Sequence, residues 1–127
     1  MDIQWPNQNE IAELNKMFGF EATDDEQDWE IEFSDENRVE EFLLTYEDAQ
    51  LSEPQKMSVM QLIIASFDEL IHSGQDNEEM WQKIESALVK DQHIHKYTIE
   101  HWCCEGETLE ENMFPTTSRM RKVANAL

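Results

Sequence analysis

The amino-acid sequence predicts an all-α fold, a single-domain bundle of five or six helices spanning residues 1–127. Apolar residues recur at spacings of three and four along most of the chain, and capping residues precede several of these segments. The length, with 39% apolar residues, fits one hydrophobic core and leaves little for a second domain. The prediction leaves open a short extended or hairpin segment near residues 27–34.

The first helix is expected over residues 8–18. Ile11, Leu14 and Phe18 lie on one helical face, and Gly19 follows as a stop signal. Farther along the chain, apolar and acidic residues alternate from Trp29 to Phe33, with the period of a half-buried strand. No second clear strand is available as a partner, so we expect an extended segment or a minor hairpin here.

Two helices are expected in the middle of the chain. Ser34 or Asp35 is expected to cap the first, which runs to about residue 46. The second has a stronger signal, because the side chains of Ser52 and Gln55 can satisfy each other's backbone N–H groups and a proline sits in the first turn. This helix carries a broad apolar face up to residue 72, so we expect it to be the central helix.

Three further helices complete the predicted bundle. Asp76 or Asn77 is expected to cap a helix with Val89 near its inward face, and a helix is also favoured over residues 93–102. Residues 105–115 are expected to form a loop, and Thr117 or Ser118 is expected to cap a last short helix.

The charge of the chain is large and localised. Asp and Glu number 29 against 9 Lys and Arg, giving a formal net charge of −20. Fourteen of these acids and one base, Arg38, lie in Glu21–Glu53, whereas the bases Arg119, Arg121 and Lys122 follow the last acid. A charge of −20 repels nucleic acid and anionic membranes, so the expected partner is a basic protein.

The acidic segment is the candidate binding site. A solvated face that keeps the chain soluble is the simpler explanation, but crowded carboxylates repel one another beyond what solubility needs. Aromatic residues threaded among acids are typical of a partner-binding patch, although the core is the simpler explanation for any one of these aromatics taken alone. The predicted partner-binding residues are Asp24, Asp25, Glu26, Asp28, Trp29, Glu30, Glu32, Asp35 and Glu36, with Trp29 as the anchor.

Catalytic and metal chemistry are weakly indicated. The possible ligands His93, His95, His101, Cys103 and Cys104 lie close in sequence, but the cysteines are adjacent and one residue separates the first two histidines. Neither spacing matches the usual zinc patterns, and no nucleotide-binding or hydrolase motif is present. We therefore expect no enzyme, no cofactor and no metal, while the sequence alone leaves metal binding by these five residues open.

The N-terminal residues contain no signal-peptide pattern, and no apolar run is long enough to span a membrane. Adjacent cysteines rarely form a disulfide, which fits a reducing compartment. These features predict a cytoplasmic protein, and they leave its oligomeric state open.

Three segments carry a resemblance to a known group. Residues 51–56 (LSEPQK), residues 60–68 (MQLIIASFD), and residues 97–102 (YTIEHW) with 114–116 (FPT) resemble small acidic bacterial immunity proteins of polymorphic or contact-dependent growth inhibition toxin systems. The resemblance covers about residues 50–127 and excludes the acidic segment. It implies a non-enzymatic protein that binds one cognate toxin domain in the bacterial cytoplasm.

The functional hypothesis is an immunity or inhibitor protein that covers the active site of a basic toxin domain, most simply a nuclease. Carboxylates on an exposed segment can occupy the positions where substrate phosphates would lie. The alternative is a DNA mimic, of the kind that phages use against host defence, which occupies a DNA-binding protein.

Overall fold

The computed structural model describes residues 5–20, 29–104, 107, 109 and 113–127, and all regular structure within them is helical. Six helices have ten or more residues, and a seventh is a single four-residue turn. The elements are α1 (Gln8–Phe18), α2 (Trp29–Glu32), α3 (Val39–Asp48), α4 (Glu53–His72), α5 (Glu78–Lys90), α6 (Gln92–Cys103) and α7 (Thr117–Ala126). The predicted helical bundle is confirmed.

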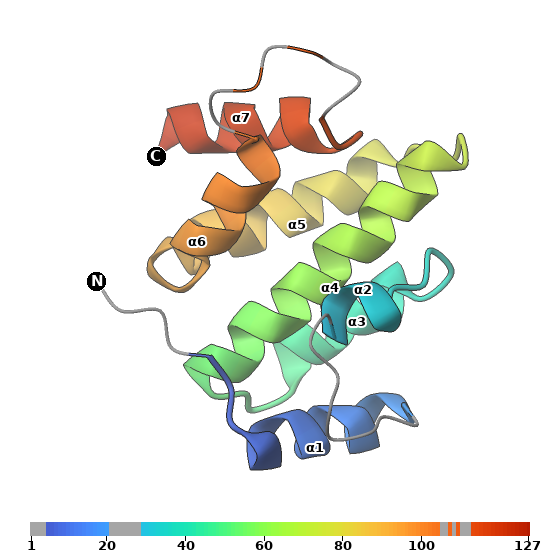
Figure 1. The fold of residues 1–127 in the computed structure, drawn as a ribbon, viewed down its shortest axis with the longest axis vertical. Coiled ribbons are helices and arrows are strands. Elements are labelled where there is room, and N and C mark those ends of the chain that lie inside the picture. Colours follow the sequence, from blue (N-terminus) through green and yellow to red (C-terminus); the bar gives the residue numbers. More distant parts are fainter. Residues whose placement is uncertain (1–4, 21–28, 105–106, 108, 110–112) are drawn as a thin grey trace.

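The central element is α4, which crosses the middle of the molecule while the other helices lie around it (Figure 1). Its side chains from Met57 to Phe67 are all buried, so no side of this stretch faces water. A helix that is apolar on all sides must be covered on all sides. Helices α1, α2, α3 and α6 contact α4 directly, and Trp81 of α5 stacks on Phe67 with ring centroids 5.7 Å apart.

The predicted start of α4 is confirmed. The amide of Gln55 donates to Ser52 Oγ over 3.2 Å, and the amide of Ser52 donates to Gln55 Oε1 over 3.0 Å. Although α4 is the longest helix, no helix in the described ranges is both long and apolar enough to cross a membrane.

Helix α1 begins and ends where the sequence predicts. Asn7 and Glu10 form a second reciprocal cap, and Gly19 ends the helix with a φ of 72°, a left-handed conformation that favours glycine. The helix buries Leu14 and Phe18 against the core. Polar contacts add to this packing, because the Gln55 side-chain amide donates to the Glu10 carbonyl over 3.0 Å.

The expected extended segment near residues 27–34 is wrong for its described part. Residues 29–32 form the helical turn α2, and the amide of Phe33 donates to the carbonyl of Trp29 over 3.1 Å. A lone extended segment would leave its backbone groups without partners, whereas a helical turn satisfies them locally. The turn also places Trp29 and Phe33 on one face, where both rings contact Phe20.

The expected cap of the next helix is also wrong. Helix α3 begins at Val39, after Arg38, and neither Ser34 nor Asp35 caps it. The Asp35 carboxylate instead accepts from the amide of Asn37 over 2.9 Å and so closes the turn that precedes the helix.

Arg38 connects the end of α1 to the start of α3. Its guanidinium donates to the carbonyl of Phe18 over 2.8 Å and lies 5.2 Å and 5.0 Å from the ring centroids of Phe20 and Phe42. The only base of the acidic segment therefore joins the end of α1 to α3, which is a structural role.

The C-terminal half largely follows the prediction, but α7 begins at Thr117, after Thr116, and neither Thr117 nor Ser118 caps it. Asn77 caps α5, while Asp76 instead pairs with Arg119 of α7. Val89, expected near the inward face, is exposed. Helix α6 ends at Cys103, and Arg121 of α7 donates to the carbonyls of Cys103, Cys104 and Glu107.

Trp29→Ala tests whether the indole belongs to the core. Its side chain is 4% exposed and its Nε1 donates to Asn15 Oδ1 over 2.6 Å, so truncation should lower the free energy of unfolding by about 3–5 kcal/mol. The same substitution at the exposed Trp5 should change it by less than about 0.5 kcal/mol. Urea unfolding of both variants measures the difference, and equal stabilities would contradict the assignment of Trp29 to the core.

Candidate functional site

The structure describes only part of the predicted acidic site. Asp24, Asp25, Glu26 and Asp28 lie outside the described residues. Glu30, Asp35 and Glu36 are half-buried, and Glu32 lies in α2. The carboxylate of Glu36 accepts from the Ser73 hydroxyl over 2.7 Å, and that of Asp35 closes its own turn, so both are partly engaged within the fold.

Trp29 does not have the role expected for it. Its indole is buried among Phe20, Phe33 and the rest of the core, and its N–H is bonded to Asn15. The aromatic residues of this segment thus hold α2 against the bundle. A buried ring cannot act as the exposed anchor of an interface, so the prediction for Trp29 needs correction.

The outer side of α3 carries a better-formed candidate, which we call the α3 acidic surface. Its residues are Glu40, Glu41, Leu44, Glu47 and Asp48, all exposed. Leu44 is 58% exposed, and the four acids stand three and four positions before and after it, the spacing of direct neighbours on a helix. An apolar centre with a charged rim is the general layout of a protein-binding patch.

This surface holds little compensating positive charge. Glu41 is paired with Arg38, whose hydrogen bonds lower the pKa of the Glu41 carboxyl. Glu40, Glu47 and Asp48 have no ion pair within the described part of the chain. The last turn of α3 contains no base, so Glu47 and Asp48 face the negative end of the helix dipole. Folding alone does not favour acids there.

Sequence reasoning overlooked this surface although a signal was present. The apolar stripe of α3 is formed by Val39, Phe42, Leu43 and Tyr46, and these residues are buried as expected. Leu44 is the apolar residue that falls off this stripe, between acids on both sides. An apolar residue outside the core-facing stripe of an acidic helix is a cue to an exposed contact site.

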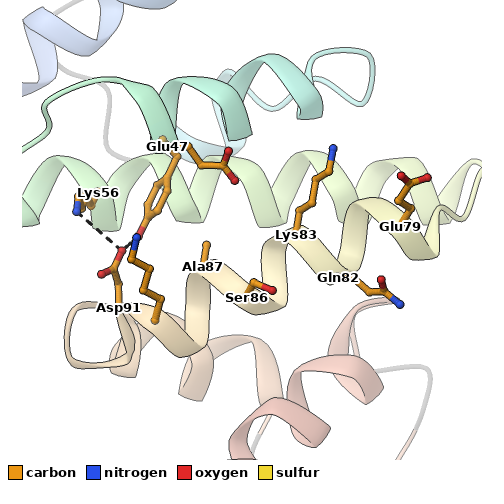
Figure 2. A pocket seen from close by; sticks show the side chains of 10 residues that line it. Glu47, Lys56, Glu79, Gln82, Lys83, Ser86, Ala87 and Asp91 are labelled. Carbon is orange, nitrogen blue, oxygen red and sulfur yellow. Dashed lines mark hydrogen bonds and ion pairs between the residues drawn. The ribbon is translucent and has the colours of Figure 1, made fainter.

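A groove of about 600 Å³ separates α3 from α5 (Figure 2). Glu47 reaches into it from α3, while Glu79, Lys83 and Ser86 line it along α5. The complete lining is Tyr46, Glu47, Lys56, Glu79, Gln82, Lys83, Ser86, Ala87, Lys90 and Asp91. Three lysines and three carboxylates balance, so the groove favours neither a cation nor an anion.

One end of the groove holds a buried polar chain. The Tyr46 hydroxyl lies 2.6 Å from Asp91 Oδ2 and 2.6 Å from His95 Nε2, and Lys56 Nζ lies 3.9 Å from the same carboxylate oxygen. Because an ionised carboxylate can only accept, the hydroxyl donates to Asp91 and accepts from a protonated Nε2 of a neutral His95. The other ring nitrogen, Nδ1, is buried without a partner among the described residues.

Burial governs the protonation of this chain. It lowers the pKa of His95 to about 4, and together with the bond to Asp91 it raises the pKa of Tyr46 above its usual value. Both groups are therefore neutral near pH 7. The chain connects α3 to the start of α6 and serves to fix their relative positions.

The possible metal ligands are not brought together. His93 pairs with Glu53 on the surface, His95 lies in the polar chain, and His101 contacts aromatic rings. Cys103 is buried, and Cys104 Sγ lies 3.5 Å from the hydroxyl of Thr117. Over the described ranges, no group of three or more His, Cys, Asp or Glu is placed to hold a metal ion.

The low pKa of His95 predicts a pH-dependent stability. Below pH 6.5 the unfolded chain takes up a proton at this site, whereas the folded chain does so only near pH 4, so stability falls as the pH drops between these values. The loss should approach about 3 kcal/mol. His95→Gln keeps a donor toward Tyr46 but cannot titrate. Urea unfolding at pH 7.5, 6 and 5 should show a steeper decline for the wild type, and parallel declines would contradict the assignment.

Asp48→Lys and Glu40→Lys test the electrostatic cost of the α3 acidic surface. Both change the net charge equally, but Asp48 lies in the last turn of α3 and Glu40 in the first. Asp48→Lys should stabilise the fold by about 0.3–1 kcal/mol, and Glu40→Lys should destabilise it by a similar amount. Urea midpoints at low and high salt measure both. Shifts of the same sign would indicate a general charge effect and no role for the dipole.

Comparison with known proteins identifies no relative of this chain. The chain matches no protein-family model, and neither the curated proteins nor the solved structures contain a match. The candidate function therefore depends on the charge, exposure and geometry of the chain itself.

Proposed function

We propose that this chain is an immunity protein that binds a basic toxin domain, most simply a nuclease, and blocks its active site. The observation that carries the proposal is the α3 acidic surface, in which the exposed Leu44 is surrounded by four carboxylates. A nuclease must present positive charge to bind phosphates, so its cleft is complementary to such a surface. In the sequence, residues 21–36 precede this surface and contain further acids.

The charge and the leucine have different tasks in this proposal. The carboxylates steer the basic partner and raise the association rate, an effect that salt screens. Leu44 enters a shallow apolar depression on the partner and slows dissociation, since most of the lifetime of a complex comes from its buried centre. Acids at the C-terminal turn of α3 weaken the helix, which is understandable if they serve binding.

Association kinetics with a nuclease toxin domain that the chain binds test the proposal. Glu40→Lys should slow association several-fold at low salt and flatten its salt dependence, whereas Leu44→Ala should mainly speed dissociation. Glu85→Lys is the matched control, because it makes the same charge change at an exposed position of α5. Equal association rates for Glu40→Lys and Glu85→Lys would contradict a specific role of α3.

Competition by duplex DNA separates this proposal from a DNA mimic. An immunity protein should bind its cognate toxin and no unrelated DNA-binding protein. Binding to several unrelated DNA-binding proteins, each displaced by duplex DNA, would instead favour the DNA mimic.

A further inference from the structure

Four exposed aromatic rings form a continuous row, which we call the aromatic strip: Trp5, Tyr97, His101 and Phe114. Neighbouring ring centroids are 5.4 Å apart for Trp5 and Tyr97, 6.2 Å for Tyr97 and His101, and 5.8 Å for His101 and Phe114. The strip joins the segment before α1, the outer face of α6 and the residues before α7. Sequence segments far apart thus converge on one surface.

The rings of the aromatic strip are unusual because they are exposed and contribute little to the core. Trp5 is 55% exposed, while the other three tryptophans are buried. Tyr97 and Phe114 also keep more than a third of their surfaces exposed, and His101 is exposed as well. Phe114 and His101 also contact the buried ring of Trp102, with centroids 4.3 Å and 5.7 Å away, whereas Trp5 and Tyr97 have no ring contact with the core among the described residues. Exposed Trp and Tyr side chains are characteristic of contact surfaces, where they contribute large area at low entropic cost.

The surrounding charges select the kind of partner. His93 lies one turn before Tyr97 on α6 and pairs with Glu53 of α4, and Glu100 is exposed on α6 beside His101. Aromatic faces attract cations, and the chain as a whole carries a charge of −20. A second copy of this chain or a nucleic acid strand would meet strong repulsion.

We propose that the aromatic strip binds an arginine-bearing basic segment of a partner protein, with guanidinium groups stacked on Trp5, Tyr97 and Phe114. The planar guanidinium stacks on aromatic faces and sheds water more easily than an ammonium, so arginine is preferred to lysine. This inference goes beyond the α3 acidic surface, since it involves other helices and another recognition chemistry. It does not require the partner to be a toxin.

NMR titration of the full chain tests the proposal with two capped peptides, one of four arginines separated by glycines and its lysine counterpart. The arginine peptide should shift the indole N–H signal of Trp5, and should bind more tightly than the lysine peptide. Trp5→Leu and Tyr97→Leu should each weaken binding about two- to fivefold, whereas Tyr97→Phe should keep it. Val89→Ala, which removes an exposed apolar residue from α5, is the control and should bind like the wild type.

Three results would overturn the proposal. Equal affinity for the two peptides would indicate charge attraction without stacking. Unchanged affinity in both leucine variants would place the contact elsewhere, and stronger binding of an uncharged proline-rich peptide would make the strip an apolar docking site. Binding of the α3 variants is measured with the toxin domain, and binding of the strip variants is measured with the peptides. A result that overturns the proposal for the aromatic strip therefore leaves the proposed function unaffected, and the reverse also holds.

Discussion

The fold depends on the burial of α4 on every side. Because residues from Met57 to Phe67 present no side chain to water, the remaining helices must each supply an apolar face to α4 or to the layer around it. This requirement fixes which side of each helix turns inward and leaves the opposite sides to carry the charge. In a chain with a net charge of −20, the outer side of α3 therefore becomes acidic without disturbing the core.

The position of α3 is also fixed by polar contacts. Tyr46 connects α3 to Asp91 and His95, and Arg38 connects its start to the end of α1. A buried polar chain contributes to specificity only when its members are paired, and here all except one ring nitrogen have partners. A helix held at both ends loses little conformational freedom when it binds. The α3 acidic surface is therefore preorganised, which reduces the entropic cost of association.

Much of the fold could be predicted from the sequence, because its signals are local. The capping box of Ser52 and Gln55, the stop at Gly19 and the helical spacing of apolar residues each act within a few positions. The errors arose where distant contacts decide the structure. Alternation from Trp29 to Phe33 indicated a strand, but contacts with the ring of Phe20 and with the side-chain oxygen of Asn15 make a helical turn the better arrangement. The contact between Tyr46 and His95 spans 49 positions and has no local signature.

The candidate site shows the same division between local and distant information. Composition located the acidic segment, but it could not separate carboxylates that the fold uses from those that it leaves free. Asp35 and Glu36 accept hydrogen bonds within the fold, whereas the exposed acids of α3, apart from Glu41, have no such bond to the described residues. Charge that is used internally is partly neutralised, and charge that remains unpaired extends its field into the solvent. Under the proposed function, steering of a basic partner would thus depend more on α3 than on the described residues that precede it.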